Sequence, residues 1–281
     1  MTIKDIDEII EQGNSLKQIA QAYAEIANLK IKRIRSEVER NRIFFKEIAD
    51  VYSLVKKMAL KKKIIIPKLK KRVSIIITSN YRFYGNINSA LIDFFITNTE
   101  KLETDRVIIG NAALDYFKNS GSVGDYMEVL LKKDQPDPEE LKSLTNKIED
   151  YNQVLVFYSR LESLMVQLPT VLDITASASA QTFDIVPSED KKVRFIFEPE
   201  LAKTLAFFDS QILTLLLEQT FLESEVARTA SRFISMDKAE TEANKFIKEY
   251  IKLKSLTQLS IDSNKLLEAI AASKKGMNNY V

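Results

Sequence analysis

The fold is decided by a long C-terminal stretch without helix breakers, of which residues 212–250 read ILTLLLEQTFLESEVARTASRFISMDKAETEANKFIKEY. Neither Gly nor Pro occurs between Glu200 and Ala272, although the chain of 281 residues contains six of each. Apolar residues recur mostly three and four positions apart, which is the pattern of an amphipathic helix. At 1.5 Å per residue this helix would be up to roughly 110 Å long. Its predicted apolar stripe includes Leu205, Ile212, Leu216, Phe233, Ala243, Phe246, Tyr250, Leu256 and Ile270.

The N-terminal residues 3–60 repeat this pattern and predict a second long helix of roughly 85 Å. The Gly13-Asn14 pair allows either one helix or two with a break there. An isolated amphipathic helix exposes its apolar stripe, at a cost of about 25 cal/mol per Å². We therefore expect the two helices to form a long antiparallel coiled coil. The predicted N-terminal stripe consists of Leu16, Ile19, Tyr23, Ile26, Ile34, Val38, Phe45, Ile48, Tyr52 and Val55.

The central part of the chain alternates short β-branched runs with helical segments. Such alternation predicts a small Rossmann-like domain with a mainly parallel sheet, so the fold class is α/β. The predicted domains are a shaft helix at 1–60, the globular domain at 61–199 and a second shaft helix at 200–281. The segment 121–138 is expected to be rich in loops. Strands are predicted at 73–78, 106–110 and 154–158, with further strand-like pieces between 161 and 199, notably 193–197; helices are predicted at 87–99, 112–118 and 139–151.

The composition excludes several kinds of chemistry. The chain has no Cys and no His, so thiolate catalysis, a serine triad with His and the usual zinc ligands are excluded. The turn at 78–88 contains a single glycine, Gly85, and so lacks both glycine-rich phosphate-binding patterns. An acidic cluster at 134–140 could hold a divalent cation, but helix capping explains it better. We predict no catalytic residue, no cofactor and no metal.

Charge is unevenly distributed along the chain, although the net charge is only +2. Residues 1–72 carry a net charge of +9 and the remainder −7. The basic segment could bind an acidic partner, a nucleic acid or anionic lipid. Alternatively, it is a helix face that only contacts solvent. No apolar run reaches the length of about 18 residues that spans a bilayer, and the N-terminus does not have the pattern of a signal peptide. A cytoplasmic protein is expected.

Seven short motifs follow one another along the chain. They are residues 19–30 (IAQAYAEIANLK), 79–88 (SNYRFYGNIN), 109–117 (IGNAALDYF), 165–169 (MVQLP), 197–199 (FEP), 232–243 (RFISMDKAETEA) and 258–273 (QLSIDSNKLLEAIAAS). In this order and spacing they resemble the gamma subunit of F-type ATP synthases over nearly the whole chain. The chain departs from that family at Gln21, where the family has Lys, at Thr257, where it has Arg, and at most of residues 80–86.

The resemblance implies a non-catalytic rotor subunit in the central stalk of a rotary ATPase. Its partners would be the alpha and beta subunits of the catalytic ring, the epsilon subunit and the membrane ring, with no nucleic acid. It would lie on the inner face of the cell membrane, held there by its complex. The resemblance also implies partner contacts at Gln21, Lys30, Arg33, Gly85, Asn88, Arg232, Lys254, Thr257, Gln258 and Ile261.

Three alternatives remain open from the sequence. A specialised paralogue could drive gliding motility instead of proton transport, since Lys- and Ile-rich composition and altered family residues fit such a role. A coiled-coil structural adaptor would have no rotary function. A Rossmann-type enzyme is disfavoured, because the glycines and the histidine that it would need are missing.

Overall fold

The structure is a computed structural model that describes residues 2–61, 69–120, 125–175 and 200–277. The predicted strand at 193–197 and the motif at 197–199 lie outside this part of the chain. The described residues form two compact units, one of residues 1–26 with 233–281 and the other of residues 27–232. Helix α1 (Ile3–Lys61) and helix α6 (Leu201–Met277) each contribute to both units.

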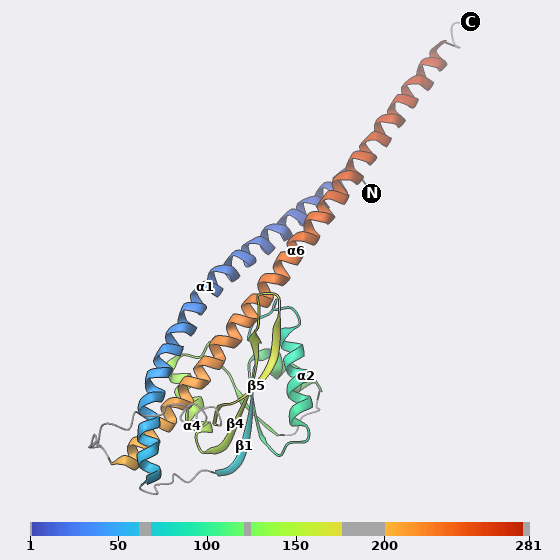
Figure 1. Cartoon of the computed structure of the whole chain (residues 1–281). Helices are drawn as coiled ribbons and strands as arrows, with labels where there is room; N and C mark the ends of the chain where they lie inside the picture. Colours follow the sequence, from blue (N-terminus) through green and yellow to red (C-terminus); the bar gives the residue numbers. More distant parts are fainter. Residues whose placement is uncertain (1, 62–68, 121–124, 176–199, 278–281) are drawn as a thin grey trace. The chain divides into compact units, whose positions relative to one another are not determined.

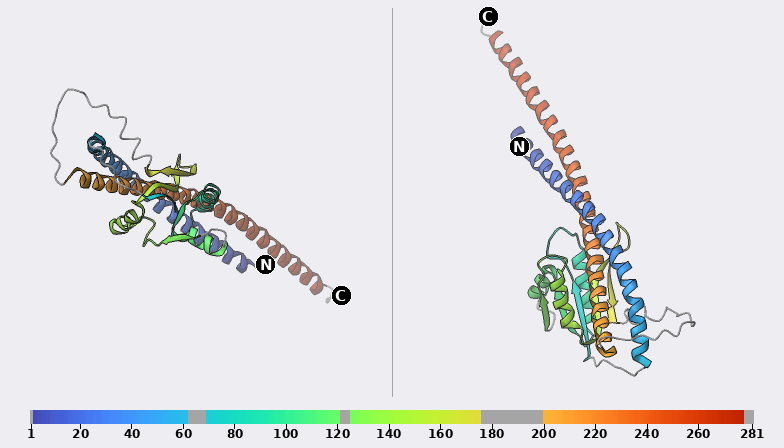
Figure 2. Two further views of the ribbon diagram at one scale, coloured as in Figure 1. Left: turned by 90° about the horizontal axis from the view of Figure 1, so that it is seen from below. Right: turned by 90° about the vertical axis from the view of Figure 1, so that its left-hand side faces the viewer.

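The first unit is an antiparallel pair made by the start of α1 and the C-terminal part of α6. Contacts fall in reversed order along the two helices, with Asp7 against Lys254 and Gln21 against Glu240. Helix α1 continues without a break through Gly13, so the alternative of two helices is wrong. Within this unit α6 continues past the N-terminus of α1 (Figures 1 and 2). The last turns of α6 therefore have no helix of this chain beside them.

Gly13 lies where the two helices approach closely. A Cβ atom at this position would meet the Ile247 Cγ1 atom at 3.0 Å and the Phe246 Cδ1 atom at 3.4 Å. Gly costs about 1 kcal/mol relative to Ala inside a helix, so propensity alone disfavours a glycine here. Close packing against Ile247 is the tertiary reason that a glycine sits in an unbroken helix.

The second unit contains a five-stranded sheet with the strand order β3-β2-β1-β4-β5. Strands β1 (Leu69–Ile77), β2 (Asp105–Ile109), β3 (Tyr126–Val129) and β4 (Tyr151–Leu161) are mutually parallel, and β5 (Gln167–Asp173) is antiparallel to β4. A Rossmann-like, mainly parallel sheet was predicted, and this is confirmed. Strand β3 lies in the segment that was expected to be rich in loops, so that expectation is wrong for these four residues. They are half-buried or exposed and lack the buried apolar run by which a strand is predicted.

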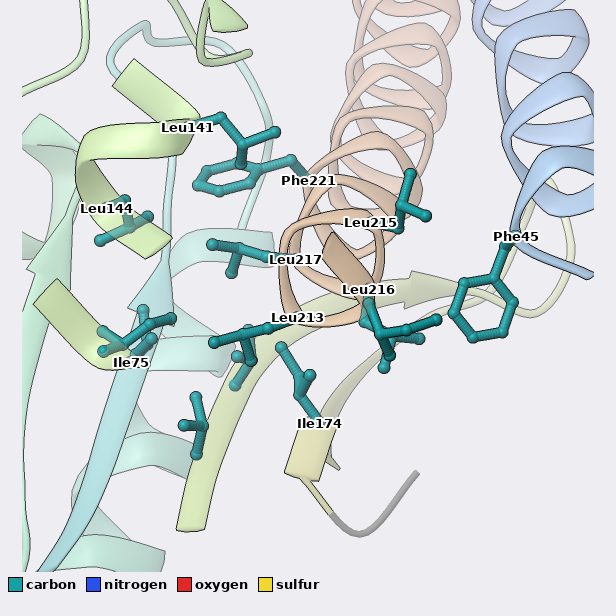
Figure 3. Close-up of a cluster of buried hydrophobic side chains, with 14 of the residues drawn as sticks. Phe45, Ile75, Leu141, Leu144, Ile174, Leu213, Leu215, Leu216, Leu217 and Phe221 are labelled. Carbon is teal, nitrogen blue, oxygen red and sulfur yellow. The ribbon is translucent and has the colours of Figure 1, made fainter. Parts of the chain in front are cut away.

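Helices cover both faces of this sheet. Successive side chains of β1 point to opposite faces, and apolar residues of β1 are buried on each. Ile75 and Ile77 point to the face covered by α1, α4 (Pro138–Ile148) and α6, whereas Ile76 points to the face covered by α2 (Ile87–Thr99) and α3 (Asn111–Ser120). Figure 3 shows the first face, where Leu213 and Leu217 of α6 point toward the sheet and α4 while Leu216 meets Phe45 of α1. The N-terminal part of α6 is thus a core helix of the α/β domain.

The acidic segment before α4 is a helix start. Asp137 is the N-cap: its side chain accepts a hydrogen bond from the Glu140 N–H, and the Glu140 side chain accepts one from the Asp137 N–H. This capping box confirms the capping interpretation for these two residues. Among the described residues, no group of three or more acidic side chains is arranged to hold a metal ion. No described helix is long and apolar enough to span a membrane.

Candidate functional site

The loop that follows β1, residues 78–86, begins at the carboxyl end of the parallel strands. Here β1 and β2 approach closely: the Thr78 N–H donates to the Ile109 carbonyl at 2.9 Å, and the Thr78 hydroxyl donates to the same oxygen at 2.8 Å. Gly110 has φ +97°, and a Cβ atom there would lie 2.4 Å from the Thr78 carbonyl oxygen. This glycine therefore serves the approach of two strands and is not part of a phosphate-binding loop.

The buried carboxylate of Asp134 anchors this loop from the segment after β3. Asp134 is 4% exposed; it accepts a 2.6 Å hydrogen bond from the Asn80 N–H and a 2.7 Å hydrogen bond from the Tyr84 hydroxyl. The Asn80 amide donates in turn to the Leu131 carbonyl at 3.1 Å. Burial, followed by the charge of Asp134, raises the pKa of Tyr84 well above its ordinary value. At neutral pH Tyr84 is thus a fixed hydrogen-bond donor to a carboxylate.

Helix α6 also contacts the loop, and we call the contact among the loop, Asp134 and α6 the junction. Ser231 donates to the Tyr84 carbonyl at 2.7 Å, and Arg232 donates to the Arg82 carbonyl at 2.9 Å. The Arg232 guanidinium also stacks on the Tyr84 ring, 3.9 Å from its centroid, in a cation–π contact. The loop is therefore bound to α6 through two of its backbone carbonyls and through the ring of Tyr84.

Arg228 is buried in the same junction and is 1% exposed. It donates to the Ser224 hydroxyl at 2.8 Å and more weakly to the Asp134 carbonyl at 3.5 Å. In doubly wound folds, ligands bind at the carboxyl ends of the strands. Here side chains of α6 occupy part of that region, which gives a structural reason for a Rossmann-like sheet without a nucleotide-binding loop.

Two aromatic side chains of the loop point outward. Tyr81 is 53% exposed and Phe83 is 64% exposed. The Tyr81 carbonyl accepts a 2.8 Å hydrogen bond from the Ser79 hydroxyl, and Phe83 has a positive φ of 67°. A positive φ costs a non-glycine residue of order 1–3 kcal/mol, and such strain is typical of functional sites. The strained and anchored loop thus presents a rigid Tyr-Arg-Phe surface.

Three residues predicted as partner contacts meet at this junction. Gly85 adopts φ +63°, and Asn88 donates to the Ser79 hydroxyl at 2.8 Å. Arg232 holds the loop from α6 as described above. The structure thus gives Asn88 and Arg232 a role in holding the loop, and Gly85 the positive φ that lets the chain turn.

Three other predicted contact residues form pairs between α1 and α6. Lys30 forms a salt bridge with Glu225, whose side chain is 4% exposed. In the first unit, Gln21 donates to Glu240 at 2.7 Å, and Lys254 lies 2.6 Å from Asp7. These three side chains fix the register of the two helices.

The remaining four predicted residues are Arg33 on α1 and three residues within about one turn of α6, Thr257, Gln258 and Ile261. Arg33 pairs with Glu37 on the same helix, and its side chain is 81% exposed. Thr257 donates to the carbonyl oxygen of Leu253, and Gln258 donates to Asp262. Ile261 is half-buried. The ten predicted residues thus divide equally between the two units.

Sequence reasoning missed Asp134, Tyr84 and Arg228 as parts of the junction. One signal was present on α6, where Leu217, Phe221, Ser224, Arg228 and Ser231 follow one another at intervals of four and three residues. An arginine on such a buried stripe indicates a polar partner inside the fold. The partner itself, Asp134, lies 94 residues away in the chain, and no local pattern links the two.

The architecture of two terminal helices around a small, mainly parallel sheet is that of the central-stalk proteins of rotary ATP synthases. The chain belongs to the ATP synthase gamma chain family: the ATP synthase family model matches residues 2–272. It is 23% identical to the ATP synthase gamma chain of Staphylococcus saprophyticus over 264 residues, covering 88% of this chain and 89% of the relative. The gamma chain of Staphylococcus aureus strain JH9 is 22% identical over 263 residues, with the same coverage.

Solved structures share the fold at low sequence identity. A chain of the Tetrahymena thermophila mitochondrial ATP synthase central stalk and c-ring has a TM-score of 0.60 and 17% identity, and the likeness covers 79% of this chain and 99% of that one. A chain of the Euglena gracilis mitochondrial ATP synthase rotor has a TM-score of 0.61 and 13% identity, covering 92% and 98%. The family model and the curated relatives confirm the predicted resemblance to the gamma subunit, and these structures share its fold.

Proposed function

We propose that this chain is the non-catalytic central rotor of an F-type rotary ATPase. The single observation that carries the proposal is the antiparallel helix pair of the first unit, from which α6 continues with an exposed apolar surface. Leu259, Leu266, Leu267 and Ile270 are all more than half exposed on this last part of α6. An apolar shaft end of this kind fits a hydrophobic collar in the ring of alpha and beta subunits.

Polar contacts and close packing oppose the sliding of the two paired helices along each other. Asp7–Lys254 and Gln21–Glu240 fix its register by polar contacts, and the close approach at Gly13 fixes it by packing. A shaft must transmit torque without slipping, and paired helices resist twisting better than one. Each exposed polar pair adds only about 0–1 kcal/mol, so the register depends on the whole set.

The junction of the second unit connects the sheet to the shaft helix. Because α6 is one continuous helix, Ser231 and Arg232 belong to the same rod that forms the first unit. Torque applied to the α/β domain would pass through the hydrogen bonds of these residues to the loop and through the buried core around Leu216 and Leu217.

Exposed cationic and aromatic residues are the proposed contacts with the catalytic ring. They are Arg33 on α1, and Tyr81 and Phe83 on the loop that carries Gly85; the polar side chain of Gln258 on α6 is a further proposed contact. Exposed ion pairs of about 0–1 kcal/mol suit contacts that must break at every step. Lys30, Gln21, Lys254 and Arg232 would act indirectly, by holding the surfaces that make contact.

The mechanism is a coupling of conformational states and requires no chemistry in this chain. A rotor without three-fold symmetry presents a different surface to each catalytic subunit, so rotation favours a different conformation of each subunit in turn. The epsilon subunit and the membrane ring are the proposed partners of the α/β domain. Through them the chain would lie at the inner face of the cell membrane as a peripheral subunit.

A rotation assay tests the proposal directly. Because the sequence has no Cys, a Lys101→Cys variant provides one exposed labelling site in the α/β domain. The variant is assembled with the alpha and beta subunits of its own organism, the ring is fixed to a surface and a bead is attached to the cysteine. We expect ATP to drive rotation in one direction, with one copy of the chain per ring.

A chain that does not associate with the ring, or a ring that hydrolyses ATP at full rate while the bead stays still, would rule out the rotor proposal. The matched control is a complex with the same label and a non-hydrolysable nucleotide, in which the bead should not rotate.

A further inference from the structure

A groove of about 430 Å³ lies between α1 and α6 within residues 27–232. Its apolar walls are formed by Phe44 of α1, Pro136, and Leu215, Phe221 and Leu222 of α6. This volume lies within the range of roughly 300–1,000 Å³ that is usual for ligand pockets. Phe44 is exposed although it borders the groove, so part of this apolar surface is uncovered.

Two carboxylates line the groove, and one of them is in an unfavourable environment. Glu218 is half-buried; burial raises its pKa, a hydrogen bond with Asn41 lowers it, and the nearby charge of Glu37 raises it again. Among the described residues no cation is within salt-bridge distance of Glu218, and Glu37 is paired with Arg33. A partly desolvated carboxylate beside a second carboxylate favours a cation in the same groove.

The same groove holds two buried polar atoms without a partner in the described part of the chain. They are the Asn41 Oδ1 atom, which is an acceptor, and the Gln135 Nε2 atom, which is a donor. A buried polar atom without a partner costs about 1–3 kcal/mol. The two amides therefore favour an occupant that brings both a donor and an acceptor.

We propose that this groove binds a basic side chain, Arg or Lys, of a partner protein segment. The cationic head would pair with Glu218 and donate to the Asn41 oxygen, the alkyl stem would lie along Phe44 and Leu222, and the carbonyl of the same residue would accept from Gln135. The inference is independent of the rotary function. Its support is that one groove contains a carboxylate with no described salt bridge, two amide atoms with no described partner, and apolar walls.

Two other occupants fit less well. A divalent cation would find oxygen ligands on Glu37, Asn41 and Glu218, but it would leave the apolar walls and the Gln135 donor without a role. Arg40 of the chain itself also lines the groove, but its side chain is exposed and it forms no described salt bridge with either carboxylate. Arg40 therefore leaves Glu218 available to pair with a cation from outside.

Titration of the full chain with small probes, followed by NMR chemical shifts, tests the inference. N-acetylarginine amide carries the head, the stem and the carbonyl; N-acetylnorleucine amide lacks the charge; butylguanidinium lacks the carbonyl. We expect N-acetylarginine amide to bind saturably, with a Kd of roughly 1–10 mM, as expected for so small a probe. Butylguanidinium should bind at least threefold more weakly, and the norleucine compound should show no saturable binding.

The Glu218→Gln variant should weaken binding of N-acetylarginine amide at least fivefold. It should remain folded, because the amide keeps one oxygen that can accept from Asn41 and removes a half-buried charge. Glu39→Gln, at an exposed position of α1 that does not line the groove, is the matched control and should bind as the parent chain does.

Equal binding of the norleucine and arginine compounds, or unchanged binding in Glu218→Gln, would overturn the proposed site. If butylguanidinium binds as tightly as N-acetylarginine amide, the ligand is a free organic cation, and the assignment to a protein segment is overturned. Saturable binding of MgCl₂ that depends on Glu218 would instead identify a metal site.

Discussion

The hydroxyl of Tyr84 donates a 2.7 Å hydrogen bond to the buried carboxylate of Asp134, 50 residues further along the chain. This contact joins the loop after β1 to the segment after β3, and α6 closes over both through Ser231 and Arg232. The junction therefore depends on groups that are buried together, so removing one group leaves its partners without hydrogen bonds.

Replacement of Asp134 by Ala should lower the free energy of unfolding by about 2–4 kcal/mol, because the Asn80 N–H and the Tyr84 hydroxyl both lose their acceptor in a buried site. Urea denaturation followed by circular dichroism measures the change. Asp115→Ala, on the exposed face of α3, is the control and should change stability by less than about 0.5 kcal/mol. If Asp134→Ala also lowers the free energy of unfolding by less than about 0.5 kcal/mol, the junction is not a stabilising contact.

Stability should fall as pH rises above about 10. Burial raises the pKa of Tyr52, Tyr84 and Tyr158 in the folded chain, so above the unfolded pKa the folded state binds more protons than the unfolded state. The free energy of unfolding must then decrease with pH. Urea denaturation at a series of alkaline pH values should show this fall, and Tyr84→Phe should reduce its slope. A slope that is unchanged in Tyr84→Phe would contradict the raised pKa of this residue.

The Lys30–Glu225 pair should show strong coupling in a double-mutant cycle. Lys30→Met alone should cost about 2 kcal/mol, because it leaves the buried Glu225 carboxylate without its counter-ion; the half-exposed position of Lys30 reduces the cost below that of a fully buried pair. Lys30→Met with Glu225→Leu should recover most of this loss. Additive effects of the two single changes would show that the pair does not contribute to stability.

Gly110→Ala should be among the most damaging single methyl additions in the chain. The new Cβ atom would lie 2.4 Å from the Thr78 carbonyl oxygen, and φ +97° is unfavourable for any L-residue. We expect a loss of about 3 kcal/mol or more, measured by thermal unfolding. Gly13→Ala is the comparison, because its Cβ atom would meet only a side chain, and the helix propensity of Ala offsets the contact. Its stability should stay within about 1 kcal/mol of the parent chain.

Phe83→Gly should weaken partner binding while leaving the stability of the folded chain nearly unchanged. Glycine accepts φ +67° without strain, so the free energy of unfolding should change by no more than about 1 kcal/mol. The loss of the exposed ring should nevertheless weaken association with the alpha and beta ring, measured by biolayer interferometry, about tenfold, since aromatic anchors dominate interface energies. Leu130→Gly, another exposed apolar position in the same unit, is the control. Equal affinities of the two variants would remove Phe83 from the proposed contact surface.

The sequence by itself determined the two terminal helices, the mainly parallel sheet and the family. Periodicity and the scarcity of Gly and Pro act locally, so the bounds of α2, Ile87–Thr99, could be predicted to the residue. Strand β3 could not be predicted, because its half-buried residues at the edge of the sheet carry no apolar pattern.

Only the tertiary structure decided which polar residues meet. The burial of Asp134, the closure of the loop by Ser231 and Arg232, the pairing of Lys30 with Glu225 and the unbroken helix at Gly13 all depend on segments far apart in the chain. A carboxylate or a glycine looks the same in sequence whether its surroundings are water or packed side chains. Desolvation and close packing assign the role, and both arise only when the chain has folded.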